Sequence, residues 1–149
     1  MPLTACWQPE KRGRLAVSTE VEMVLRLLLA AGLGAAIGYQ RERAKKPAGL
    51  RTHILICIGA AIFTVVSMYG FGTGVDTSRV AAGVVAGIGF LGAGTIMRRG
   101  EGIVEGLTTA ATIWAVAAIG LATGAGLYII AGVATGITLA VLFLPHHIQ

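Results

Sequence analysis

The sequence predicts an all-α integral membrane protein with about five transmembrane helices, rich in glycine and alanine, and without a soluble domain. Hydrophobic residues make up 55% of the 149 residues, charged residues make up only 13%, and the mean hydropathy is +0.78. A soluble domain has about 25% charged residues, so this chain has too few charges to cover a water-exposed surface. The 22 glycines agree with this class, because glycine is more frequent in membrane helices than in soluble ones.

The beginning of the chain differs from the remainder. It contains two prolines and a basic run at residues 11–14, and no apolar stretch follows that run as it would in a signal peptide. We predict a disordered or non-native extension over residues 1–19 and a transmembrane domain over residues 20–149. A translation start at Val17 is a further hypothesis, because the product would begin directly at a helix start with acids in its first turn.

Five apolar segments follow, and crossing a hydrocarbon core takes roughly 20 such residues. The predicted spans are residues 21–39, 52–68, 79–97, 107–122 and 127–144. Arg26 is the only charged residue well inside the first span, and we expect its side chain to snorkel to the membrane surface. Small residues let helices approach closely, and we predict this helix-packing role for Gly34, Gly38, Gly83, Gly87, Gly132 and Gly136.

The third segment has glycines on several faces at once. Such a helix is expected to be enclosed by other helices or locally unwound, because glycine costs about 1 kcal/mol against alanine in a helix. Gly87, Gly89 and Gly92 match the Gly-x-Gly-x-x-Gly pattern. That pattern indicates a dinucleotide site only between a strand and a helix, and here it lies inside an apolar span. The sequence therefore predicts no cofactor.

The distribution of basic residues predicts the orientation of the chain. With five spans, the segments around residues 40–51 and 98–106 share one side with seven basic residues, against five on the other side. A start at Val17 would change the contrast to seven against two. By the positive-inside rule, we place these two segments and the C-terminus in the cytoplasm and the N-terminus outside, in the bacterial inner membrane.

The polar residues indicate no enzyme. The sequence has no Ser/His/Asp set, no paired carboxylates, no HExxH motif and no phosphate-binding GxxxxGK[ST] motif. Mg²⁺ usually takes one or two carboxylates among oxygen ligands, yet none of the seven acids lies at the centre of a span. This weakens a coupled transporter, while a permease or channel for Mg²⁺ or a small solute along the glycine-lined third span stays open.

The basic segment Arg41–His53 is the largest charged island between two apolar spans. Three interpretations stay open for it: contact with anionic headgroups, pairing with acids of this chain such as Glu42, and docking to another membrane protein. We expect His53 to be an interfacial polar residue. The candidate functional residues are Arg41, Glu42, Arg43, Lys46, Pro47, Arg51, Thr52 and His53, with Glu105, Thr108 and Thr109 facing them.

Three motifs in order resemble the MgtC/SapB family of bacterial inner-membrane proteins. They are Arg41–Arg43 with Lys46–His53, then Gly87–Gly94, then Gly106–Ala111 with Trp114. The resemblance extends over about residues 22–144 and implies a transmembrane domain of about five helices. It also implies a role in magnesium homeostasis and in survival at low magnesium or inside host cells, where the family is linked to virulence. The implied mechanism is binding of another membrane protein, such as the ATP synthase or a cation transporter, and self-association is a further expectation.

The chain departs from the family pattern in two respects. Gly83 and Ala86 stand where members usually have an amide and a serine, which removes two polar groups from the third span. Many members also continue into a soluble domain, whereas this sequence ends at Gln149. Regulation carried by such a domain is therefore not predicted here.

Overall fold

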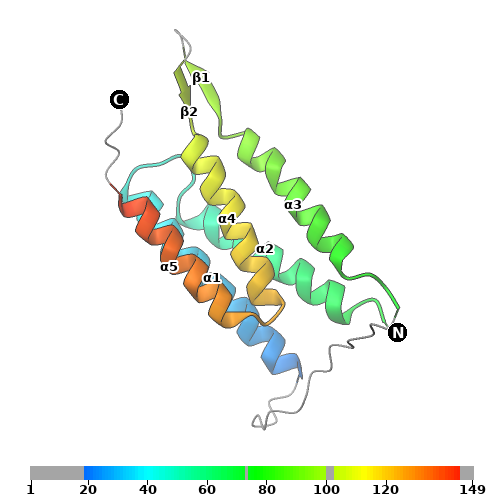
Figure 1. Cartoon of the computed structure of the whole chain (residues 1–149). Helices are drawn as coiled ribbons and strands as arrows, with labels where there is room; N and C mark the ends of the chain where they lie inside the picture. The colour runs from blue at the N-terminus through cyan, green and yellow to red at the C-terminus, as the bar shows by residue number, and fades with distance from the viewer. Residues whose placement is uncertain (1–18, 73, 100–102, 145–149) are drawn as a thin grey trace, which may run out of the picture.

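A computed structural model describes residues 19–72, 74–99 and 103–144. In this part of the chain, five helices and one β-hairpin follow each other as α1 (Thr19–Arg43), α2 (Leu50–Tyr69), α3 (Ser78–Ala93), β1 (Met97–Arg99), β2 (Ile103–Glu105), α4 (Leu107–Gly124) and α5 (Tyr128–Phe143). The prediction of an all-α membrane protein with five helices is confirmed (Figure 1). The predicted extension, apart from its last residue, and the Val17 start lie outside the described residues.

The helices differ in length. α1, α2 and α4 are long and apolar enough to cross a membrane. α3 and α5 are apolar helices of 16 residues each, which extend about 24 Å at about 1.5 Å per residue. The two shorter helices therefore need flanking residues to match a hydrocarbon core of about 30 Å.

The connections between helices gather at two ends of the bundle. Figure 1 shows residues 44–49, the β-hairpin and the last turn of α5 at one end, with the start of α1 and the α4–α5 turn at the other. A hydrogen bond of 3.3 Å from Gln40 Nε2 to the carbonyl of Leu142 joins the ends of α1 and α5. The two polar segments that the sequence places on one side of the membrane thus lie at one end of the fold.

The core lies between α1, α2 and α4 and depends on small residues. Ala30, Ala61 and Val116 are fully buried in it. A Cβ at Gly34 would lie 2.7 Å from the carbonyl oxygen of His53, so α1 and α2 approach each other backbone to backbone there. A Cβ at Gly124 would lie 2.7 Å from the carbonyl oxygen of Ala61, which gives α2 and α4 the same close approach.

The turn before α3 is closed by Asp76. Its Oδ1 accepts hydrogen bonds from the backbone N–H of Ser78 at 2.9 Å and from the Ser78 hydroxyl at 2.7 Å. These two bonds favour the ionised carboxylate and lower the pKa of Asp76. An aspartate just before a helix commonly stabilises its first turn in this way.

The structure corrects the third predicted span and the second polar loop. α3 ends at Ala93, and Met97, predicted to lie in that span, begins a short antiparallel hairpin in which it pairs with Glu105. After the helix, the Thr95 hydroxyl donates to the carbonyl of Gly92 at 2.8 Å and turns the chain. Gly106 then has φ +95°, and any Cβ there would collide with the Thr95 carbonyl. Only glycine fits at this point between β2 and α4.

The predicted enclosure or unwinding of α3 is wrong. α3 is a continuous helix that packs on α4, where Gly92 lies next to Ala110. A methyl group at Gly83 or Gly87 would meet no heavy atom of the described chain within 4 Å, and both positions are exposed. The same holds for the α5 positions Gly132 and Gly136. Within the described chain these four glycines do not pack helices together, because a Cβ at any of them would point into open space.

Candidate functional site

The basic segment turns sharply after α1. Lys45 has φ +52°, in the left-handed region. The N–H of Lys46 donates to the carbonyl of Arg41 at 3.1 Å, and the N–H of Lys45 donates to that of Glu42 at 3.0 Å. This pair of bonds is the Schellman arrangement that closes many helices, although glycine usually takes the left-handed position. Pro47 then prevents the helix from continuing, and the segment is held in one shape.

Arg41 is the buried cation of this segment. Its side chain is 3% exposed, and its Nη2 donates a 2.7 Å hydrogen bond to the hydroxyl of Thr109. Thr109 lies in the first turn of α4 and is itself buried. This contact between α1 and α4 brings together two of the predicted site residues. The Arg41 Nε is buried without a hydrogen-bond partner among the described residues.

Glu42 caps the next helix. Its Oε2 accepts the backbone N–H of Leu50, the first residue of α2, at 2.8 Å. A carboxylate at this position also interacts favourably with the positive end of the helix dipole. A Cβ at Gly49 would lie 2.9 Å from the same oxygen, so the glycine makes room for the cap. Among the described residues, Glu42 thus bonds to the backbone rather than forming the ion pair that the sequence suggested.

The His53 side chain is not exposed at the protein surface, as a residue at the membrane interface would be. It is fully buried between α1 and α2, beneath Gly38. Its Nδ1 lies 2.8 Å from the carbonyl oxygen of Gly49, and it must carry the proton because a carbonyl only accepts. The Nε2 is buried without a hydrogen-bond partner in the described part of the chain. The expectation of an interfacial histidine fails because glycines on α1 let α2 approach closely enough to cover the ring.

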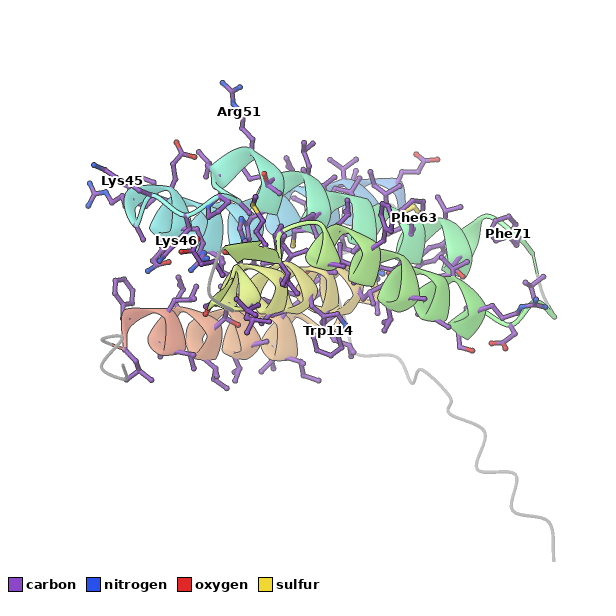
Figure 2. The ribbon with its side chains drawn as sticks, turned by 90° about the horizontal axis from the view of Figure 1, so that it is seen from above. Lys45, Lys46, Arg51, Phe63, Phe71 and Trp114 are labelled. Carbon is purple, nitrogen blue, oxygen red and sulfur yellow. The ribbon has the colours of Figure 1, made fainter. Side chains whose placement is uncertain are left out.

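The remaining basic residues point outward. Figure 2 shows Lys45, Lys46 and Arg51 extending away from the ribbon around the turn. Arg43 lies over the Tyr39 ring, with its Cζ 4.8 Å from the ring centroid. Within the basic segment, the exposed members of the predicted set are Glu42, Arg43, Lys46, Pro47, Arg51 and Thr52. The segment therefore divides into a buried group that joins helices and an exposed group that carries positive charge.

Two further predicted residues lie on the second polar segment. Glu105 is exposed on β2, and Thr108 is exposed in the first turn of α4. The backbone carbonyl of Thr108 accepts the hydroxyl of Thr112 at 2.6 Å. Of the three residues predicted to face the basic segment, Thr109 bonds to it directly through Arg41.

Sequence reasoning missed a second polar cluster at the opposite end of the bundle, around Arg26. Its side chain is 7% exposed instead of snorkelling to the surface. Nη1 donates to the carbonyl of Gly124 at 2.6 Å, and Nη2 lies 2.9 Å from the Glu22 carboxylate. The Tyr128 hydroxyl donates to the same carboxylate at 3.3 Å. The Glu22/Arg26 spacing of four residues is the sequence signal that would have indicated this pair.

Comparisons with known proteins match residues 27–149 to the MgtC family. The putative magnesium transporter YhiD of Escherichia coli is 48% identical over 134 residues, covering 85% of this chain and 62% of that protein. Protein SapB of Bacillus subtilis is 40% identical over 72% of this chain and 49% of its own length. Protein MgtC of Brucella abortus is 50% identical over 73% of this chain and 45% of its own length.

The chain thus spans about half to two thirds of the length of these relatives. No solved structure matches it.

Proposed function

Because the chain belongs to the MgtC family, we propose that it acts in magnesium homeostasis and in adaptation to low magnesium by binding another membrane protein. Relatives named as a putative magnesium transporter and as MgtC support the link to magnesium. The proposed partner is a membrane protein with an acidic cytoplasmic face, such as the ATP synthase or a cation transporter. In this proposal the basic segment and the β-hairpin face the cytoplasm, and the start of α1 faces outside.

The observation that carries the proposal is the division of the basic segment into buried and exposed groups. Arg41 bonds to Thr109 of α4, while Glu42 and His53 bond to backbone groups within the segment, so the backbone between them is held in place. A surface that is already ordered loses little conformational entropy when it binds. Four exposed basic side chains, Arg43, Lys45, Lys46 and Arg51, outnumber the exposed Glu42. Such a net positive patch attracts an acidic surface and orients it.

Reversing one exposed charge tests the docking surface. We expect Lys46→Glu to lower recovery of the crosslinked partner by roughly five- to tenfold, because an exposed charge pair contributes up to about 1 kcal/mol and reversal adds repulsion. Growth at low magnesium should fall with it. The measurements are crosslinking in cells, partner identification by mass spectrometry, and growth of a strain that depends on this protein.

Arg79→Glu is the matched control, because Arg79 is exposed at the opposite end of the bundle. It should leave both recovery and growth unchanged at equal membrane abundance. If Lys46→Glu inserts normally and behaves like Arg79→Glu, the basic segment is not the docking surface.

The rival function is a permease for Mg²⁺ or a small solute. The hollow beside the glycines of α3 has a volume of about 410 Å³ and a lining made of apolar residues and glycine. Mg²⁺ requires oxygen ligands in near-octahedral geometry, and the described residues contain no group of three or more His, Cys, Asp or Glu side chains that could hold a metal. We therefore favour modulation of a partner over transport.

Purified protein in liposomes separates the two functions. We expect Mg²⁺ entry, followed with an enclosed fluorescent indicator, to equal that of empty vesicles. Vesicles containing a known magnesium channel provide the positive control. Mg²⁺ entry above background that scales with the amount of reconstituted protein would replace the modulator proposal with the permease.

A further inference from the structure

A surface groove runs between α2 and α3 along much of their length. Its first part is a hollow of about 410 Å³ between Phe63 of α2 and the glycine-bearing face of α3. Its second part is a hollow of about 460 Å³ beside the first turns of α2, floored by Leu55 and Ile113. Leu91 lines both hollows, so the two lie next to each other. Each has the size of a small-molecule site, for which about 300–1,000 Å³ is typical.

Two glycines of α3 help to leave the first hollow open. Gly83 and Gly87 line the first hollow, and a Cβ at either would meet nothing within 4 Å. The adjacent side chains of Phe63, Val84 and Leu91 are apolar. This part of the groove offers a smooth hydrocarbon surface, which suits a flexible apolar chain better than a polar solute.

The other end of the groove is polar and positively charged. Arg51, Thr52 and Thr95 line the second hollow, and none of its nine lining residues is acidic. Arg51 and Thr52 belong to the first turn of α2, where the Glu42 carboxylate already accepts the N–H of Leu50. The positive charge at this end of the groove therefore comes from the Arg51 side chain. Lys46 directly precedes the lining residue Pro47 and is exposed.

We propose that this groove binds one anionic phospholipid, with an acyl chain along α3 and the phosphate beside Arg51. The polarity along the groove follows the same order as in a phospholipid. An apolar part lies along α3, and a positively charged part lies at the end of a membrane-spanning helix. Arg51 is one of the lining residues, and its guanidinium extends away from the ribbon (Figure 2), from where the flexible side chain can fold over a phosphate. Charge complementarity selects an anionic headgroup over a zwitterionic one.

The headgroup portion of this site shares Arg51 and Thr52 with the proposed docking surface. The acyl-chain portion lies along α3 and is not part of that surface, so Gly87→Leu tests lipid binding separately from docking. A bound acyl chain also explains how the glycine-rich α3 persists as a helix although no other helix encloses it. The acyl chain would occupy the space that another helix was expected to fill.

Native mass spectrometry of the full chain in detergent micelles tests the site. Phosphatidylglycerol, phosphatidylcholine with the same acyl chains, and inorganic phosphate are each titrated. We expect phosphatidylglycerol to bind about fivefold more tightly than phosphatidylcholine, and Arg51→Gln to remove this preference, since one basic residue near an anionic lipid contributes about that factor. Inorganic phosphate alone should not compete at millimolar concentration, because it lacks the acyl chain.

Filling the groove should strongly reduce the retention of phosphatidylglycerol. Gly87→Leu places a side chain in the first hollow and should lower retention of phosphatidylglycerol at least tenfold. Gly136→Leu is the matched control, because Gly136 is equally open on α5 and does not line the groove. Circular dichroism checks that both variants keep their helices, which leucine favours over glycine.

Three results would overturn the proposal. One is equal retention of the two lipids by the unchanged chain. Another is unchanged retention of phosphatidylglycerol in Gly87→Leu when its helix content is intact. The third is a dimer that Gly87→Leu dissociates while lipid retention stays constant, because a second copy of the chain would then occupy the groove.

Discussion

Gly34→Leu will cause the largest loss of stability of any single change considered. Gly34 is where α1 lies directly on α2: a Cβ would be 2.7 Å from the carbonyl oxygen of His53 and 2.8 Å from the Cβ of Cys57. Both contacts are with atoms fixed by the backbone, so the helices must separate. Overpacking of a core costs about 1–3 kcal/mol, and we expect about 3 kcal/mol here. The measurement is unfolding in mixed micelles with increasing SDS, followed by circular dichroism.

The same helix provides the control for this prediction. Gly32 is exposed, and a Cβ there would meet nothing within 4 Å. Gly32→Leu should therefore leave stability unchanged or raise it by up to about 1 kcal/mol through helix propensity. Equal unfolding curves for the two leucine variants would show that α1 and α2 are not in backbone contact at Gly34.

Separation of α1 from α2 also reaches the candidate site. His53 is fully buried by this close approach, and its bond to Gly49 helps to fix the start of α2. We expect Gly34→Leu to expose the ring and loosen the basic segment. A packing glycine outside the charged turn thus controls the shape of that turn.

The sequence was sufficient for the number of helices and for the basic turn. Helix positions follow from long apolar runs, because each run must satisfy its own backbone in lipid. The reversal after α1 follows from Pro47 and Gly49, two residues with strong local preferences. Features determined within a few residues of the chain were therefore predictable.

Features that depend on which helices become neighbours were not predictable. His53 and Arg26 are polar residues near the ends of apolar runs, and composition alone assigns both to the membrane surface. Each is buried because a distant segment covers it: α1 covers His53, and the α4–α5 turn accepts the hydrogen bond of Arg26. The glycines of α3 did not predict whether that helix is packed or open, because glycine permits both close helix contact and an open groove.

Arg26→Gln will weaken the opposite end of the bundle. The guanidinium joins α1 to the end of α4 through its 2.6 Å bond to the Gly124 carbonyl. The shorter glutamine does not reach that carbonyl, and a buried acceptor left without its donor costs about 1–3 kcal/mol. The Glu22 side chain is 32% exposed, so loss of the ion pair adds little to this cost. We expect a loss of about 2 kcal/mol in SDS unfolding.

Two further variants separate the hydrogen bond from the charge. Glu22→Gln keeps Arg26 on the Gly124 carbonyl, so it should cost much less than Arg26→Gln. Arg79→Gln removes an exposed arginine at the first turn of α3 and should have no effect on unfolding. If Glu22→Gln is as damaging as Arg26→Gln, the ion pair is what holds this end together. If Arg26→Gln unfolds like Arg79→Gln, Arg26 reaches the membrane surface, as its position in the sequence alone had suggested.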